Sequence, residues 1–203
     1  KFKCPSCESN IYKEQDKKIL PKPKGATRIL ALDQATYTTG YSILDDGKLI
    51  KSGTFETNLS DEIARINMIK MWLVSMLENW QPDCVGIEGI QFQEESQGKR
   101  MSVTVFQALA RLQGVILDTC FDFKIPCEIC HTNVWRNHCG VKGRYRADKK
   151  RSMQLKIKEW YDITEEDIKK INDATEWCAA DNGYFRGGGY SSRFLTRAEM
   201  PAT

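Results

Sequence analysis

The run Ile29-Leu30-Ala31-Leu32-Asp33 is four apolar residues followed by an acid. A short apolar run of this kind predicts a buried strand. A carboxylate at the end of a core strand is costly unless it is solvated, paired or bound to a cation. The run Cys84-Val85-Gly86-Ile87-Glu88 repeats the pattern. Because α/β folds gather their chemistry beyond strand ends, Asp33 and Glu88 are candidate site residues.

A second pair of acids lies near the carboxyl end of the chain. Asp173 and Glu176 are three residues apart in a helix predicted over 173–184, so their side chains share one face. Four carboxylates from separate segments predict a divalent-cation site, since Mg²⁺ takes oxygen ligands. Asp181 lies about two helical turns after Asp173 and is an alternative to Glu176 as the fourth ligand. An ordinary acid at a helix end is the simpler interpretation of Asp181.

The order of the predicted elements indicates the fold class. A three-strand meander, with Asp46-Gly47 as a hairpin turn, is followed by alternating helices and strands. That order predicts an α/β fold with a mixed central sheet and helices on both faces. The predicted strands are 28–33, 40–44, 49–55, 84–88 and 124–130, and the predicted helices are 61–80 with Ser60 as N-cap, 103–121, 148–161 and 173–184.

The 203 residues suit one core and a small appendage. Residues 1–26 are rich in Lys and Pro and lack periodic apolar residues, so we expect an N-terminal appendage and linker there. The domain with the predicted core spans 27–186. Residues 187–203, which begin with three glycines, are expected to be a flexible tail.

Eight cysteines without a visible secretory signal favour a reducing compartment, and we expect a cytoplasmic protein. Cys4-Pro5-Ser6-Cys7 is half of a zinc-ribbon signature, which makes Cys4 and Cys7 candidate Zn²⁺ ligands, although Zn²⁺ normally takes four. A second C-x-x-C, Cys127 to Cys130, fits a strand better, in which cysteine acts as a small apolar residue. We interpret those two thiols as core residues, together with Cys84, Cys120 and Cys178.

Basic residues concentrate in one stretch although the net charge is only +3. Residues 141–160 carry eight Lys or Arg residues against two acids, which suits a phosphate backbone. The Gly143-Arg144-Tyr145-Arg146 end is the better DNA-binding candidate, whereas Lys156 and Lys158 read as a solvated helix face. No apolar run approaches the roughly 20 residues of a membrane helix, so no membrane partner is expected.

Several motifs together resemble the RuvC family of Holliday-junction resolvases, which have the RNase H-like fold. The matching stretches are Leu32-Asp33, Thr39-Gly40-Tyr41, Ile87-Glu88, Gln107 to Val115, Gly143 to Lys149 and Asp173-Ala174-Thr175-Glu176. They cover about residues 27–186. The chain departs from the family in having Gln34-Ala35 after the first acid and a longer loop after Glu88, which resembles the divergent resolvases of bacteriophages.

The resemblance implies an endonuclease that resolves Holliday junctions or other branched DNA in recombination and repair. The catalytic and metal-binding residues would be Asp33, Glu88, Asp173 and Glu176. They would hold two Mg²⁺ ions, with Mn²⁺ as a possible substitute, and paired nicks would leave 5′-phosphate and 3′-hydroxyl ends. Symmetric cutting implies a homodimer, and a phage origin would place it in the cytoplasm of a bacterial host.

The same resemblance implies DNA contacts. Phe92, in the polar loop after Glu88, would stack on bases at the junction, or alternatively fold back onto the core. The expected phosphate contacts are Lys99, Arg100, Arg144, Arg146 and Lys149.

Three other functions stay open. One is a non-catalytic, structure-selective DNA-binding module on the same scaffold, which need not keep the four acids. Another is a related nuclease acting on RNA–DNA hybrid or flap DNA, because the same metal chemistry serves every nucleic acid. An actin-like or sugar-kinase ATPase is disfavoured, since the sequence offers neither a second phosphate loop nor a Gly-rich adenosine site after a strand.

Overall fold

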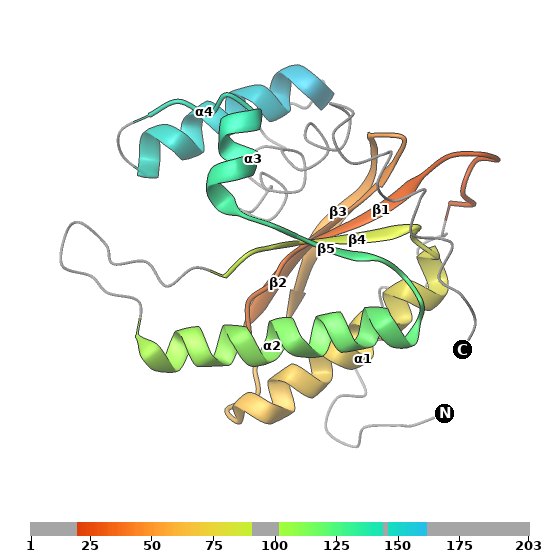
Figure 1. Ribbon diagram of the computed structural model, residues 1–203, viewed down its shortest axis with the longest axis vertical. Coiled ribbons are helices and arrows are strands. Elements are labelled where there is room, and N and C mark those ends of the chain that lie inside the picture. The colour runs from red at the N-terminus through yellow and green to blue at the C-terminus, as the bar shows by residue number, and fades with distance from the viewer. Residues whose placement is uncertain (1–19, 91–101, 144–145, 162–203) are drawn as a thin grey trace.

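The computed structural model describes residues 20–90, 102–143 and 146–161, which build a five-stranded mixed sheet with helices on its two sides (Figure 1). The strand order is β3-β2-β1-β4-β5. The elements are β1 (Arg28–Asp33), β2 (Thr38–Asp45), β3 (Lys48–Glu56), α1 (Glu62–Trp80), β4 (Cys84–Glu88), α2 (Val103–Asp122), β5 (Cys127–Cys130), α3 (Thr132–His138) and α4 (Arg146–Tyr161).

The first three strands form the predicted antiparallel meander. Asp46 and Gly47 both have positive φ, 46° and 78°, which is the type I′ geometry of a two-residue hairpin loop. Tyr41 of β2 lies opposite Gly53 of β3. A Cβ on Gly53 would come within 2.9 Å of the Tyr41 hydroxyl oxygen, so the glycine makes room for this fully buried ring.

The last two strands extend the sheet beyond β1, on the side away from β2. β4 pairs in parallel with β1, and β5 pairs in parallel with β4. The carboxyl ends of β1, β4 and β5 therefore meet at one edge of the sheet. Residues Arg28 to Leu32 are all buried, because β1 is the central strand and both of its faces are covered.

Helices α1 and α2 pack together against one face of the sheet, and α3 and α4 lie on the other side (Figure 1). The main core is therefore a sheet-and-helix layer built from Leu30, Leu32, Tyr41, Ile43, Phe55, Ile66, Ile69, Trp72, Leu73, Met76, Leu77, Trp80, Val85, Ile87, Leu112, Ile116 and Cys120. Phe55 stacks on Trp72 with ring centroids 5.0 Å apart. The predicted fold class, a mixed sheet with helices on both faces, is confirmed.

The start of α1 differs from the prediction by one residue. The N-cap is Asp61, whose carboxylate accepts a hydrogen bond of 2.7 Å from the Ala64 amide, and not Ser60. Both residue types are good caps, so sequence alone did not separate the two neighbours. In the helix that begins after Asp61, Ile63 is exposed, and Arg65 is buried together with Ile66.

Helix α3 was not expected. The segment Thr132–His138 forms two helical turns where the sequence analysis placed no helix or strand. Separately, β5 begins at Cys127, three residues later than the predicted strand 124–130, and ends at Cys130 as predicted. Start and stop signals are present in the sequence, with a threonine at the first position and Gly140, at φ 60°, just after the end. The apolar periodicity that marks longer helices is lacking in seven residues.

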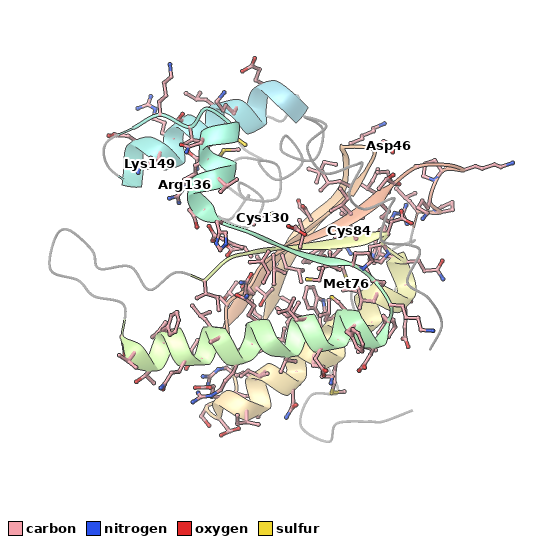
Figure 2. All side chains as sticks on the ribbon, viewed as in Figure 1. Asp46, Met76, Cys84, Cys130, Arg136 and Lys149 are labelled. Atoms are coloured by element: carbon pink, nitrogen blue, oxygen red, sulfur yellow. The ribbon has the colours of Figure 1, made fainter. Side chains whose placement is uncertain are left out.

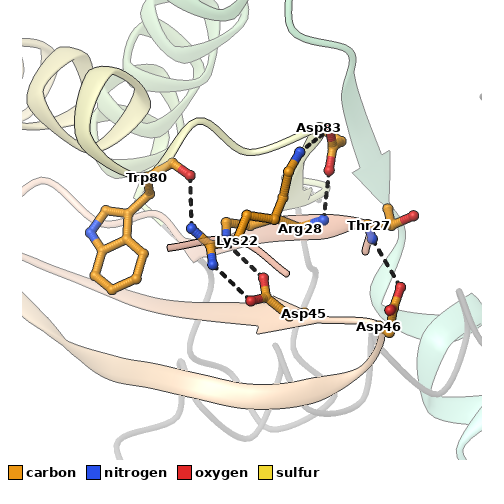
Figure 3. A network of polar contacts seen from close by, with 7 residues as sticks. All are labelled: Lys22, Thr27, Arg28, Asp45, Asp46, Trp80 and Asp83. Carbon is orange, nitrogen blue, oxygen red and sulfur yellow. Dashed lines mark hydrogen bonds and ion pairs between the residues drawn. The ribbon is translucent and has the colours of Figure 1, made fainter. Parts of the chain in front are cut away.

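A buried ionic network joins the sheet to the end of α1, at the edge opposite the carboxyl ends of β1, β4 and β5 (Figure 3). Arg28 forms a two-pronged ion pair with Asp45, with N–O distances of 2.6 and 2.7 Å, and donates to the Trp80 carbonyl at 3.2 Å. Asp83 accepts from the Arg28 amide and from Lys22, both at 2.7 Å. The guanidinium charge is therefore fully compensated inside the core.

The cysteines among the described residues behave as core residues. Cys84, Cys120 and Cys130 are buried free thiols, and Cys127 is half-buried. A hydrogen bond with Cys120, together with burial, raises the pKa of the Cys127 thiol well above its ordinary value, so Cys127 stays protonated and is a poor metal ligand. Figure 2 shows Cys130 at the carboxyl end of β5, where the chain leads into α3, whereas Cys84 lies at the amino end of β4.

Within the described residues no helix is long and apolar enough to cross a membrane. Residues 20–26 contact the domain through Lys22, but most of the predicted appendage, Cys178 and the predicted tail lie outside the described ranges. The division into 1–26, 27–186 and 187–203 thus stays a prediction.

Candidate functional site

Two of the four predicted acids end neighbouring strands of the sheet. Asp33 is the last residue of β1, and Glu88 is the last residue of β4. The two strands are parallel, with Leu32 in register with Ile87, so the two acids follow at adjacent positions of the same sheet edge. Both side chains are half-buried. Asp173, Glu176 and the alternative Asp181 lie outside the described residues.

Neighbouring polar side chains hold Glu88 in place. The hydroxyl of Thr132, the first residue of α3, donates a hydrogen bond of 2.6 Å to Oε1 of Glu88. The side-chain amide of Gln34 donates to the main-chain carbonyl of Glu88. The Gly89 amide donates to the Cys130 carbonyl at 2.8 Å and extends the β4–β5 ladder past the acid. The sequence analysis assigned no role to Thr132 or Gln34.

The loop that follows Asp33 has a well-anchored backbone. The Thr39 hydroxyl donates to the Ala35 carbonyl at 2.8 Å, and the Thr57 hydroxyl donates to the Thr36 carbonyl at 2.8 Å. The Thr57 amide donates to the Tyr37 carbonyl, also at 2.8 Å. Since Thr39 and Thr57 are buried, residues 34–37 are fixed to the sheet beside the two acids.

An imidazole lies against the residue after Glu88. A Cβ on Gly89 would come within 2.7 Å of Nδ1 of His131, so the glycine lets the ring approach the backbone there. His131 is exposed and directly follows β5. The position of His131 directly after a predicted strand, 124–130, is the sequence signal that marks it as a candidate site residue.

The donor atoms at this edge fit a hard divalent cation. Asp33 and Glu88 offer carboxylate oxygens, which suit Mg²⁺ or Mn²⁺ and not the thiolate-rich sites of structural zinc. Among residues 20–90, 102–143 and 146–161, no three His, Cys, Asp or Glu side chains come together as a metal centre. The other two predicted acids, Asp173 and Glu176, lie outside these ranges.

The predicted DNA-binding residues are only partly described. Lys149 is a half-buried residue of α4, and Arg146 is the first residue of that helix. Figure 2 shows Lys149 and Arg136 on the side of the sheet opposite Met76 of α1. The remaining candidates, which lie outside the described residues, are Phe92, Lys99, Arg100 and Arg144.

A glycine sets the path of the chain into α4. Gly143 has φ +146°, and a Cβ there would come within 2.6 Å of the Asp148 Cβ and 2.8 Å of the Lys149 amide nitrogen. The Lys142 amide also donates to the Ser152 hydroxyl at 3.1 Å. The chain before α4 thus lies close against its first two turns.

Solved structures share this architecture. The chain superposes on RuvC of Thermus thermophilus in complex with a Holliday junction substrate with a TM-score of 0.62 at 14% identity, covering 80% of this chain and 96% of that one. The yeast mitochondrial Holliday junction resolvase Ydc2 gives a TM-score of 0.57 at 12% identity, covering 92% and 89%. The fold is RNase H-like, of the RuvC type. At these identities the likeness establishes the RuvC-like fold and no more.

Comparison with known sequences does not place the chain in a protein family. No protein-family model matches the chain. L-fucose isomerase of Clostridium perfringens is 51% identical over 47 residues, and that of Haemophilus influenzae is 49% identical over 47 residues. Each match covers 23% of this chain and 8% of the isomerase, so the chain spans less than a tenth of those relatives. A segment of that size does not assign the RuvC-like domain to their family.

Proposed function

We propose that this protein is a metal-dependent endonuclease that resolves four-way or other branched DNA. The observation that carries the proposal is the pairing of Asp33 and Glu88 at adjacent parallel strand ends of a RuvC-like sheet. Acids at this edge would serve a hydrolytic nuclease. They would be unexplained in a scaffold that only binds DNA.

The four acids would act together as metal ligands. Asp33 and Glu88 would hold the cations together with Asp173 and Glu176. When bound, Mg²⁺ ions activate a water for attack on the phosphodiester and neutralise the leaving 3′-oxygen. The Thr132 and Gln34 hydrogen bonds would hold Glu88 in one orientation during the reaction. The products would carry 5′-phosphate and 3′-hydroxyl ends.

The nucleic acid would be held largely by its phosphates. Arg144, Arg146 and Lys149, where the chain enters α4, would meet the backbone, with Lys99 and Arg100 from the loop after β4. Phe92 of that loop would stack on a base near the branch point. The described part of α4 supports this proposal, since its acids are only Asp148 and Glu159 among many basic residues.

Assembly and setting belong to the same proposal. Paired nicks in opposite strands require two sites, so we propose a homodimer of the 27–186 domain. The departures from the family pattern suggest a bacteriophage-type enzyme, which would work in the cytoplasm of its host. Cys4 and Cys7, which lie outside the described residues, would be half of a separate zinc site, as their zinc-ribbon spacing suggests.

The decisive experiment compares DNA substrates and acid variants. The full chain is incubated with a synthetic four-way junction, a flap, a linear duplex and an RNA–DNA hybrid, with Mg²⁺ or with EDTA. Paired nicks confined to the junction and abolished by EDTA are expected. Asp33→Asn and Glu88→Gln should bind the junction and not cut it, whereas Asp118→Asn, an exposed acid of α2, should cut normally.

Each other outcome changes the conclusion in a defined way. Tight junction binding by the unaltered protein without nicks would replace the proposal with a non-catalytic, structure-selective module. Preferential cutting of the hybrid or the flap would keep the metal chemistry and overturn the substrate. Full activity of Asp33→Asn would remove Asp33 from the mechanism.

A further inference from the structure

Tyr37 is an aromatic side chain that folding leaves largely in water. It lies in the loop between β1 and β2, four residues after Asp33, and is 58% exposed. A tyrosine in this state contributes little to the core, and the sequence analysis gave it no role. Its position at the carboxyl end of β1 places it at the same edge of the sheet as Asp33 and Glu88.

The backbone beneath Tyr37 is held rigidly. Its carbonyl accepts from the Thr57 amide, and the preceding carbonyl, of Thr36, accepts from the Thr57 hydroxyl, both at 2.8 Å. Thr57 is only 2% exposed. An exposed ring on a fixed backbone loses little further conformational freedom when a ligand covers it.

A buried cation supports the ring. The guanidinium carbon of Arg65 lies 4.1 Å from the Tyr37 ring centroid, which is a cation–π contact. Nη1 of Arg65 donates to the carbonyls of Leu59 and Ser60 at 2.8 and 2.7 Å, and the residue is 6% exposed. No carboxylate within the described residues forms an ion pair with Arg65, so its charge is balanced there by carbonyl dipoles alone.

We infer that Tyr37 is a stacking platform for an unpaired base of the branched DNA, with Arg65 as its fixed positive support. The inference rests on the proposed nuclease function and adds a contact to it. A flat ring accepts any base by stacking, and an adjacent positive charge that has no carboxylate partner within the described residues favours a polyanionic ligand over an apolar or basic surface. The pinned loop sets the distance between this platform and Asp33, so a base held there would fix which phosphate reaches the acids.

The test separates stacking from simple shielding of Arg65. Junction binding is measured in EDTA with the full chain, using four-way junctions that carry 2-aminopurine next to the branch point. Tyr37→Phe keeps the ring and should bind within twofold of the unaltered protein. Tyr37→Ala should weaken junction binding about 10-fold, weaken linear-duplex binding much less, and lose the 2-aminopurine quenching. Phe121→Ala, which removes a 77% exposed aromatic at the far end of α2, should change none of these values.

The failures of the two proposals are distinguishable. If the unaltered protein cuts junctions while Tyr37→Ala binds and quenches normally, the platform is wrong and the nuclease stands. If the unaltered protein neither binds nor cuts branched DNA, the proposed function itself fails. A change of sedimentation coefficient in Tyr37→Ala, with junction affinity per dimer unchanged, would reassign the ring to a contact between two copies. Thermal melting of each variant checks that the fold is retained.

Discussion

The hydroxyl of Thr132 donates a hydrogen bond of 2.6 Å to Oε1 of Glu88. Glu88 is the last residue of β4, and Thr132 is the first residue of α3, two positions after the end of the neighbouring parallel strand β5. Thr132 is 6% exposed, and water competes little for its hydroxyl. The contact therefore restricts the rotation of the Glu88 carboxylate at the end of β4.

Removing this hydroxyl should weaken cation binding without weakening DNA binding. Thr132→Val keeps the shape of the side chain and leaves Glu88 without its donor. Partners of this kind typically contribute 10–100-fold to metal affinity or activity, so we expect Mn²⁺ affinity, measured by electron paramagnetic resonance, to fall about 10-fold. Junction affinity in EDTA should be unchanged. Thr132→Ser should restore Mn²⁺ binding, and equal losses in Ser and Val would mean that the contact does not orient Glu88.

Removing the charges of Arg144 and Arg146, where the chain enters α4, should reduce the salt dependence of junction binding. Each phosphate contact contributes close to one unit to the slope of log K against log salt concentration. Replacing Arg144 and Arg146 by Ala should therefore lower the slope by about two units. The matched control replaces Lys156 and Lys158, which we interpret as a solvated helix face. A similar loss of slope in both double variants would indicate that the phosphate contacts are distributed along α4.

The buried ion pair of Arg28 and Asp45 should be costly to break. Asp45→Asn leaves an uncompensated guanidinium in the core, and the free energy of unfolding should fall by about 3–5 kcal/mol. Asp118→Asn makes the same change in a pair of 3.7 Å whose carboxylate is 67% exposed, and we expect an effect below about 1 kcal/mol. Urea unfolding of both variants gives the comparison. Equal effects would show that the Arg28 network contributes no more than a surface pair.

Two Gly→Ala substitutions should have opposite signs. Gly53→Ala places a methyl group against the buried ring of Tyr41, and we expect a loss of about 1–3 kcal/mol. Gly114→Ala on α2 meets no atom within 4 Å and removes a poor helix former, so a gain of up to about 1 kcal/mol is expected. Thermal unfolding reports both signs. A stable Gly53→Ala variant would mean that the Tyr41 ring can shift.

The sequence predicted the strands that carry Asp33 and Glu88 because each is a short apolar run with an acid at its end. It did not predict the Thr132 contact, because that bond depends on β5 lying beside β4. Strand pairing of this kind leaves no local mark in the sequence. The same limit applies to Gln34, whose partner Glu88 is 54 positions away. Arg65 was missed for a different reason, since a charged residue one position from Ile66 reads as part of a polar helix face until its carbonyl partners are seen.

The central position of β1 has a consequence for how the site survives partial unfolding. A middle strand exchanges its amide hydrogens only when the sheet as a whole opens, whereas peripheral elements open at lower cost. Asp33 ends the central strand of the sheet, β1, and its neighbour Glu88 ends the strand beside it, β4. Opening of α4 alone would interrupt its contacts with DNA while Asp33, Glu88 and the Thr132 contact stayed in place, so the protein could bind a junction again without rebuilding this part of its site.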